Sequence, residues 1–122
     1  MTTMNTVIAY VDGLKPNAYT DEDKYRWLNQ LEGMLSTEVF QDETPLCYAL
    51  PADADKPLRV GHPYEEIYPL YVMAQIDFHN REYGNYNNTM AMFHTRLEQL
   101  KVYHLRNREM GTAGKFRNVM GG

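Results

Sequence analysis

Apolar residues recur at helical spacing along much of this 122-residue chain. Residues 3–12 place apolar side chains three and four apart, which predicts a short helix with Gly13 as its stop. Thr20, followed by three acidic residues, predicts the start of a second helix that ends near Phe40. The expected buried stripes are Met4, Val7, Ile8 and Val11 in the first helix, and Trp27 or Leu28, Leu31, Leu35 and Val39 in the second.

The most informative stretch of the chain is residues 63–93. Within it, residues 64–82 predict a third helix that is apolar nearly all round, and such a helix has to be covered on every side. Pro69 should kink this helix if it starts at Glu65, but it lies in the tolerated first turn if the helix starts two or three residues later. Because a chain this short offers little cover, we expect part of it to come from other subunits.

A turn at Gly84 and Asn85 is expected to join the third helix to a fourth. The fourth helix should run from about residue 86 to residue 108. Its apolar stripe follows a spacing close to seven residues: Tyr86, Met90, Phe93, Leu97, Leu100 and His104. The predicted fold class is therefore all-α, with about four helices and a central antiparallel hairpin made of the two longer ones.

Two segments carry no helical pattern. Residues 41–62 contain three prolines and predict a long loop, which is either an arm that reaches a neighbouring subunit or a disordered surface loop. Residues 111–122 are rich in glycine and predict a flexible C-terminal tail. We expect one helical domain over residues 1–110, followed by this tail.

Charge is unevenly distributed along the chain. The net charge is −4, but residues 1–80 hold 5 Lys and Arg against 13 Asp and Glu, whereas residues 81–122 hold 7 against 3. Such asymmetry can orient a head-to-tail association, although two ordinary solvated surfaces would give the same count. The acidic total argues against a generic nucleic-acid coat, which binds by neutralising phosphates.

The residues form no catalytic constellation. A lone Cys47 excludes an intramolecular disulfide and a cysteine-based metal site. No two histidines are four apart, and no phosphate-binding loop is present. We therefore expect no enzyme activity, no catalytic residue, no cofactor and no metal. The longest apolar run is also too short for a membrane span, so we expect no membrane partner.

Ten tyrosines are present, and several cluster around the third helix and the turn that follows it. Because tyrosine is enriched at protein interfaces, we expect an oligomer interface there, with ordinary core aromatics as the alternative. The candidate interface residues are Tyr64, Tyr68, Tyr71, Tyr83, Asn85 and Tyr86. Near the C-terminus, Lys115, Phe116 and Arg117 place an aromatic ring between two cations, which suits either a docking peptide or a frayed terminus.

Four short segments carry a resemblance to a known family. They are Asn17-Ala18-Tyr19 before the acidic helix start, Pro63-Tyr64-Glu65-Glu66, Ala74-Gln75-Ile76-Asp77, and residues 83–88. With these segments, residues 7–108 resemble the head–tail connector proteins of tailed phages and prophages, also called head-completion or adaptor proteins.

The resemblance implies an all-helical subunit of a closed homo-oligomeric ring that stacks beneath the portal and continues the DNA channel. The implied partners are further copies of the chain, the portal protein, a tail or stopper protein and, transiently, the packaged DNA. The implied location is the virion, at the head–tail junction, after synthesis in the bacterial host cytoplasm. Family members often grip the portal with a C-terminal segment, which corresponds loosely to residues 115–117. Pro69 departs from the family pattern.

Two alternatives to a connector stay open. The first is a small DNA-binding packaging factor that resembles a terminase small subunit, and it would need a basic surface. The candidate row for that surface is Arg96, Lys101, Arg106 and Arg108. The second is a helical-bundle protein of another function.

Overall fold

Helices make up the whole regular structure of the described residues in this computed structural model, which confirms the all-α prediction. The structure describes the backbone of residues 2–120 and the side chains of residues 2–107. The helices are α1 (Met4–Leu14), α2 (Asp21–Met34) with a π-helical turn η1 (Leu35–Val39) that continues it, α3 (Ile67–His79) and α4 (Tyr83–Met120).

Thr3 is the N-cap of α1, and its side chain and that of Thr6 cap each other's backbone. The Thr6 N–H donates to Thr3 Oγ1 at 3.2 Å, and the Thr3 N–H donates to Thr6 Oγ1 at 2.9 Å. The helix ends at Leu14, so Gly13 lies within its last turn and the predicted stop at Gly13 is wrong. All four residues of the predicted stripe are buried.

α2 starts as predicted, because Thr20 Oγ1 accepts a hydrogen bond from the Asp23 N–H at 3.1 Å. Trp27 and Leu28 are both buried, so both belong to the stripe. The helix ends in the single π-helical turn η1, closed by the bond from the Phe40 N–H to the Leu35 carbonyl at 3.0 Å. The predicted end near Phe40 is therefore confirmed.

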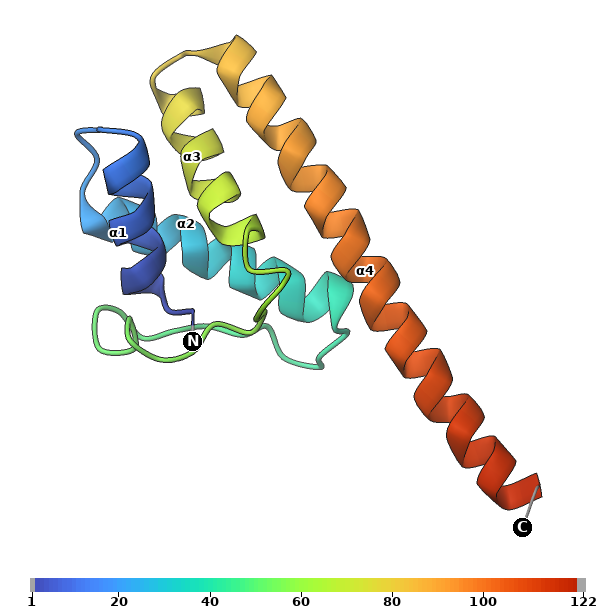
Figure 1. The fold of residues 1–122 in the computed structure, drawn as a ribbon. Coiled ribbons are helices and arrows are strands. Elements are labelled where there is room, and N and C mark those ends of the chain that lie inside the picture. The colour runs from blue at the N-terminus through green and yellow to red at the C-terminus, as the bar shows by residue number, and fades with distance from the viewer. Residues whose placement is uncertain (1, 121–122) are drawn as a thin grey trace.

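α3 is covered by its own chain. It lies between α4 on one side and α1 with α2 on the other (Figure 1), and Phe78 and His79 are its only largely exposed residues. Most of its cover therefore comes from within the chain, while the expectation that other subunits add to it stays a prediction that concerns the exposed Phe78 and His79. Because the helix begins at Ile67, Pro69 is its third residue and lies in the tolerated first turn.

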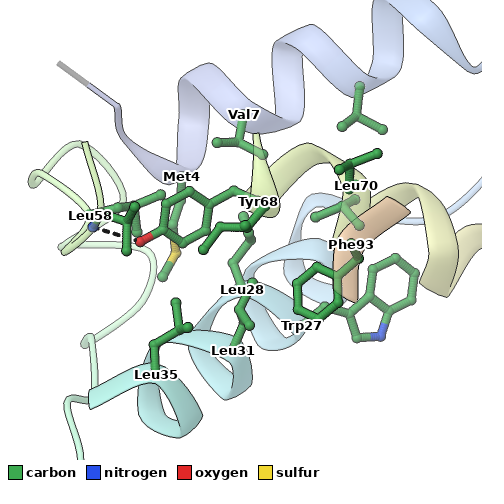
Figure 2. Packing of buried hydrophobic residues seen from close by; sticks show 14 of the residues in the cluster. Met4, Val7, Trp27, Leu28, Leu31, Leu35, Leu58, Tyr68, Leu70 and Phe93 are labelled. Atoms are coloured by element: carbon green, nitrogen blue, oxygen red, sulfur yellow. Dashed lines mark hydrogen bonds between the residues drawn. The ribbon is translucent and has the colours of Figure 1, made fainter. Parts of the chain in front are cut away.

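The core is assembled from all four helices. Figure 2 shows Met4 and Val7 of α1, Leu31 of α2, Tyr68 of α3 and Phe93 of α4 packed against one another. Burial of a leucine or phenylalanine side chain contributes about 2 kcal/mol, so these contacts fix how the helices are arranged.

The turn between α3 and α4 comes earlier than predicted. Arg81 has a φ of 62°, and its N–H donates to the Phe78 carbonyl at 3.0 Å, while the Glu82 N–H donates to the Asp77 carbonyl at 2.8 Å. These two bonds form a Schellman cap with arginine in the position that glycine usually holds. The prediction of a turn at Gly84 and Asn85 is therefore wrong, because both lie in the first turn of α4.

α4 packs antiparallel to α3, as predicted, and then continues beyond the body of the molecule (Figure 1). Phe93, Leu97 and Leu100 of its predicted stripe are buried. Its backbone is helical to Met120, whereas the sequence pattern ended it at Arg108. The residues of the predicted tail, 111–122, lie outside the described side chains, so the flexible tail and the domain boundary at residue 110 stay predictions.

The long loop before α3 packs onto its own core. Tyr48, Ala54, Leu58 and Val60 are buried, and the Leu58 N–H donates to the Thr2 carbonyl at 2.8 Å. The loop is therefore neither the arm nor the disordered surface segment that the sequence suggested. Its apolar residues were the available signal that it contributes to the core.

Candidate interaction surfaces

A buried acid, Glu32 of α2, holds the loop against α3. The Tyr68 hydroxyl donates to Glu32 Oε1 at 2.5 Å, and the Arg59 backbone N–H donates to Glu32 Oε2 at 2.9 Å. The Tyr48 hydroxyl lies 2.9 Å from both Glu32 Oε2 and the Pro57 carbonyl oxygen. The Tyr68 oxygen also accepts the Val60 N–H at 2.9 Å. Three separate parts of the chain are thus joined by one polar network.

Burial is the main cause of the raised pKa of Tyr68 and of Tyr48, and the negative charge of Glu32 adds to it. Both hydroxyls therefore stay protonated and remain donors. Glu32 does not stand out in the sequence as a site residue. The available signal was its place on the apolar face of α2, four residues after Leu28 and three before Leu35.

Two ion pairs fix the connector between α1 and α2. The ammonium of Lys24, which is almost fully buried, lies 2.8 Å from Asp12 Oδ1, and Asn17 Nδ2 donates to the same oxygen at 3.0 Å. Lys15 Nζ lies 2.6 Å from Oδ1 of the buried Asp77, a charge contact without hydrogen-bond angles. Burial raises the pKa of Asp12, but the bonds from Lys24 and Asn17 outweigh it and leave that pKa lowered.

Aromatic rings also join the segment between α1 and α2 to the C-terminal end of α3. The rings of Tyr19 and Trp27 are 5.6 Å apart, the ring of His79 stacks on Trp27 at 5.3 Å, and the Tyr19 hydroxyl donates to Asn80 Oδ1 at 2.8 Å. Residues 17–19 of the resemblance therefore meet the C-terminal end of α3. Residues 83–88 begin just beyond that end, whereas residues 63–66 lie before the N-terminal end of α3.

Exposed aromatic residues gather at the turn between α3 and α4. Phe78 is 46% exposed and Tyr83 is 53% exposed. The Phe78 ring centre lies 6.0 Å from that of Tyr83 and 5.3 Å from that of the half-buried Tyr86. Asn85 is exposed beside them and donates to Glu82 Oε2 at 3.2 Å. We call Phe78, Tyr83, Asn85 and Tyr86 the turn surface.

The six candidate interface residues do not form one surface. Tyr83, Asn85 and Tyr86 lie together on the turn surface, but Tyr64 and Tyr71 are half-buried against Tyr103 and Phe93 respectively. Tyr68 has no exposed area and bonds to Glu32, so its assignment to an interface is wrong. The docking candidates Lys115, Phe116 and Arg117 lie outside the described side chains.

Two cations of the basic row of α4 pair with carboxylates of the same chain. Arg96 pairs with Glu66 at 3.1 Å, and Lys101 pairs with Glu98 at 3.5 Å. Arg106 is exposed, and the side chain of Arg108 lies outside the described part. Apolar side chains are exposed beside these cations, namely Val102 at 51% and Leu105 at 54%. We call residues 102–106 the projecting segment of α4, in which Tyr103 and His104 still contact Tyr64 and Phe40 of the body, while Val102, Leu105 and Arg106 are exposed.

The four histidines lie apart from one another. His62 contacts Glu65 at 3.2 Å, His79 stacks on Trp27, His94 is exposed on α4, and the ring of His104 packs edge-on against Phe40. Among the described residues no group of three His, Cys, Asp or Glu side chains could hold a metal ion. Over the same part of the chain, no helix combines the length and the apolar character that crossing a membrane requires.

Comparisons with protein-family models, with curated proteins and with solved structures find no match to this chain.

Proposed function

We propose that this chain is a structural subunit that assembles with copies of itself, and that its assembly is a head–tail connector ring of a tailed phage or prophage. The observation that carries the proposal is the exposure of apolar side chains at two separate places, the turn surface and the projecting segment, on a chain whose core is closed. Exposed apolar patches on an otherwise well-packed protein are typical of contact sites.

The two surfaces lie apart and differ in their residues, so each would meet a different patch of a neighbouring copy or another partner, which favours a head-to-tail arrangement. A contact between two different patches repeats from copy to copy, and it closes into a ring if the rotation per copy allows it. A contact between identical patches would instead stop at a dimer. The opposite charge balance of residues 1–80 and 81–122 supports the same arrangement, because it lets unlike ends of neighbouring copies attract each other.

The charge of the body supports a place beside DNA without binding to it. Basic walls would hold a passing duplex through its phosphates, whereas an acidic body does not. In α4, Arg96 and Lys101 are paired with carboxylates, which disfavours the packaging-factor alternative. On this proposal the ring lies between the portal and a tail or stopper protein.

Affinity capture from the native host during particle production tests the proposal. A tagged copy of the full chain would be recovered, its partners identified by mass spectrometry, and the eluate viewed by electron microscopy. We expect portal and capsid proteins together with ring-shaped densities, and an untagged chain in the same host is the control.

Other outcomes of the capture would count against a connector. Recovery of DNA or terminase without portal would favour the packaging factor. Recovery of neither portal nor terminase would reject both phage roles. Salt-sensitive binding of the purified chain to duplex DNA would also favour the packaging factor, because neutralised phosphates release counterions.

A further inference from the structure

A groove of about 510 Å³ lies between the first half of α2 and the loop. Its apolar lining, here called the floor, includes Tyr25, Leu50 and Pro51, and its acidic lining, here called the rim, is Asp21 and Glu22 from the first turn of α2. A surface of this kind suits an amphipathic helix that presents apolar side chains to the floor and a cation to the rim.

The negative rim of the groove is uncompensated. Among the side chains that the structure describes, Asp21 and Glu22 form no ion pair, and the one cation that lines the groove, Arg26, is paired with Asp23 at 2.8 Å. The Tyr25 pKa is raised by burial and by the charges of Asp21 and Asp55, which is consistent with a negative potential in the groove. A partner that brings a positive charge would therefore be favoured.

The projecting segment of α4 offers the matching surface. Val102, Leu105 and Arg106 are spaced three and four apart, so they share one face of the helix. All three are exposed, and within the described side chains Arg106 has no acidic partner. The segment thus combines two apolar side chains with a cation, as the groove requires.

The groove cannot take the projecting segment of its own chain. α4 is a continuous helix that leads away from the body, whereas the start of α2 and the loop near residue 50 lie on the opposite side of the molecule (Figure 1). The segment would have to come from another copy.

We propose that the groove between α2 and the loop binds the projecting segment of α4 from a second copy of this chain. This inference rests on the proposed self-assembly and names the two surfaces that meet. Because the surfaces differ, each copy uses its groove for one neighbour and its projecting segment for the other, which generates a ring or a filament. The turn surface stays free for a different partner.

The native Cys47 provides a reporter for this contact. It is the only cysteine, it is exposed, and its Sγ lies 3.6 Å from Nδ2 of Asn29, which lines the groove. A Leu105→Cys variant of the full chain, treated with a short bismaleimide at chain concentrations up to about 1 mM, should give a ladder of cross-linked dimers and higher species. The control Met92→Cys places a thiol on α4 at a residue that is 57% exposed but lies alongside α3, and it should stay monomeric.

Two outcomes of the cross-linking would overturn the inference. The first is equal cross-linking by Leu105→Cys and Met92→Cys, or none by either. The second is cross-linking of Leu105→Cys that persists when Cys47→Ser is added, because α4 would then contact α4 of the other copy. Connector rings recovered by capture together with either outcome would leave the proposed function intact and remove only this interface.

A charge exchange provides an independent check. Arg106→Glu and Glu22→Lys should each weaken self-association, measured by sedimentation, about tenfold. An equimolar mixture of the two variants should regain self-association in sedimentation, because the acidic segment of one then meets the rim of the other that carries the lysine. Failure of the mixture to regain it, with both variants still folded by thermal unfolding, would contradict the proposed contact.

Discussion

Replacing Tyr68 with phenylalanine should destabilise the fold strongly, although it removes a single oxygen atom. That oxygen donates to Glu32 and accepts from the Val60 N–H, and both partners lie in the interior. The phenylalanine ring keeps the packing but leaves a carboxylate oxygen and a backbone N–H without a partner. A buried polar group left unsatisfied costs about 1–3 kcal/mol, and more if it is charged, so we expect a loss of about 3 kcal/mol.

Urea unfolding followed by Trp27 fluorescence measures this loss, because Trp27 is buried and is the only tryptophan. With an m-value of about 2 kcal/mol/M, a loss of about 3 kcal/mol lowers the midpoint by roughly 1.5 M. The matched control is Tyr103→Phe, which removes a hydroxyl from a side chain that is 43% exposed and should change stability by less than about 0.5 kcal/mol.

A Tyr68→Phe variant as stable as its control would refute the reasoning, since it would mean that Glu32 and Val60 have other partners or that water reaches them. The double variant Glu32→Leu/Tyr68→Phe tests whether the stability lost in Tyr68→Phe comes from the unpaired carboxylate of Glu32. Because removal of both polar partners avoids an orphaned carboxylate, it should be less destabilised than the sum of the single variants.

Three further outcomes follow from the structure. Burial, aided by a neighbouring carboxylate, raises the pKa of Tyr68, so the contribution of this hydroxyl to the free energy of unfolding is complete below pH 10 and is lost as the pH rises above that value. Above pH 10 the free energy of unfolding should therefore fall more steeply in the wild type than in Tyr68→Phe, by about 1.4 kcal/mol per pH unit. Equal slopes for the two proteins would contradict this expectation. Gly84→Ala should raise the melting temperature and increase the free energy of unfolding by about 1 kcal/mol, because Gly84 lies in the first turn of α4 with open space around it. A lower melting temperature would place Gly84 in the connection between α3 and α4 and not in the helix. Asp12→Ala should lower the free energy of unfolding by about 2 kcal/mol, measured in urea, because it leaves the buried Lys24 unpaired. The control Glu98→Ala, which removes a surface carboxylate, should lower it by less than about 1 kcal/mol. Similar losses in the two variants would show that the ion pair with Asp12 does not stabilise the buried Lys24.

The helices were predictable because their signals are local. Thr20 caps α2 through a bond to a residue three positions on, and the stripe of α1 follows from the helical period alone. The position of the turn after α3 was not predictable in this way. Glycine is the usual residue in the left-handed conformation, so Gly84 was the natural choice, but Arg81 adopts it and the Schellman bonds fix it there.

The cover of α3 could not be predicted because it comes from contacts distant in sequence. Residues 41–62 lack periodicity, and their place in the core depends on Glu32, which receives bonds from Tyr48 and Arg59 of that segment. An acid on the apolar face of a helix indicates an internal partner, but it does not identify which residue provides it. The sequence pattern alone therefore places Tyr68 at an interface, although it is fully buried in the structure.

Closure of the core within one chain has a consequence for assembly. If α3 needed a neighbour for its cover, folding and association would be a single event, and variants of either would affect both. Here the buried network at Glu32 and the exposed Arg106 lie in different parts of the molecule, so their effects should separate. Tyr68→Phe should lower the unfolding midpoint of the monomer, whereas Arg106→Glu should leave that midpoint unchanged and alter only the self-association measured by sedimentation. An Arg106→Glu chain that unfolds at lower urea as a monomer would show that the projecting segment supports its own fold rather than a neighbouring copy.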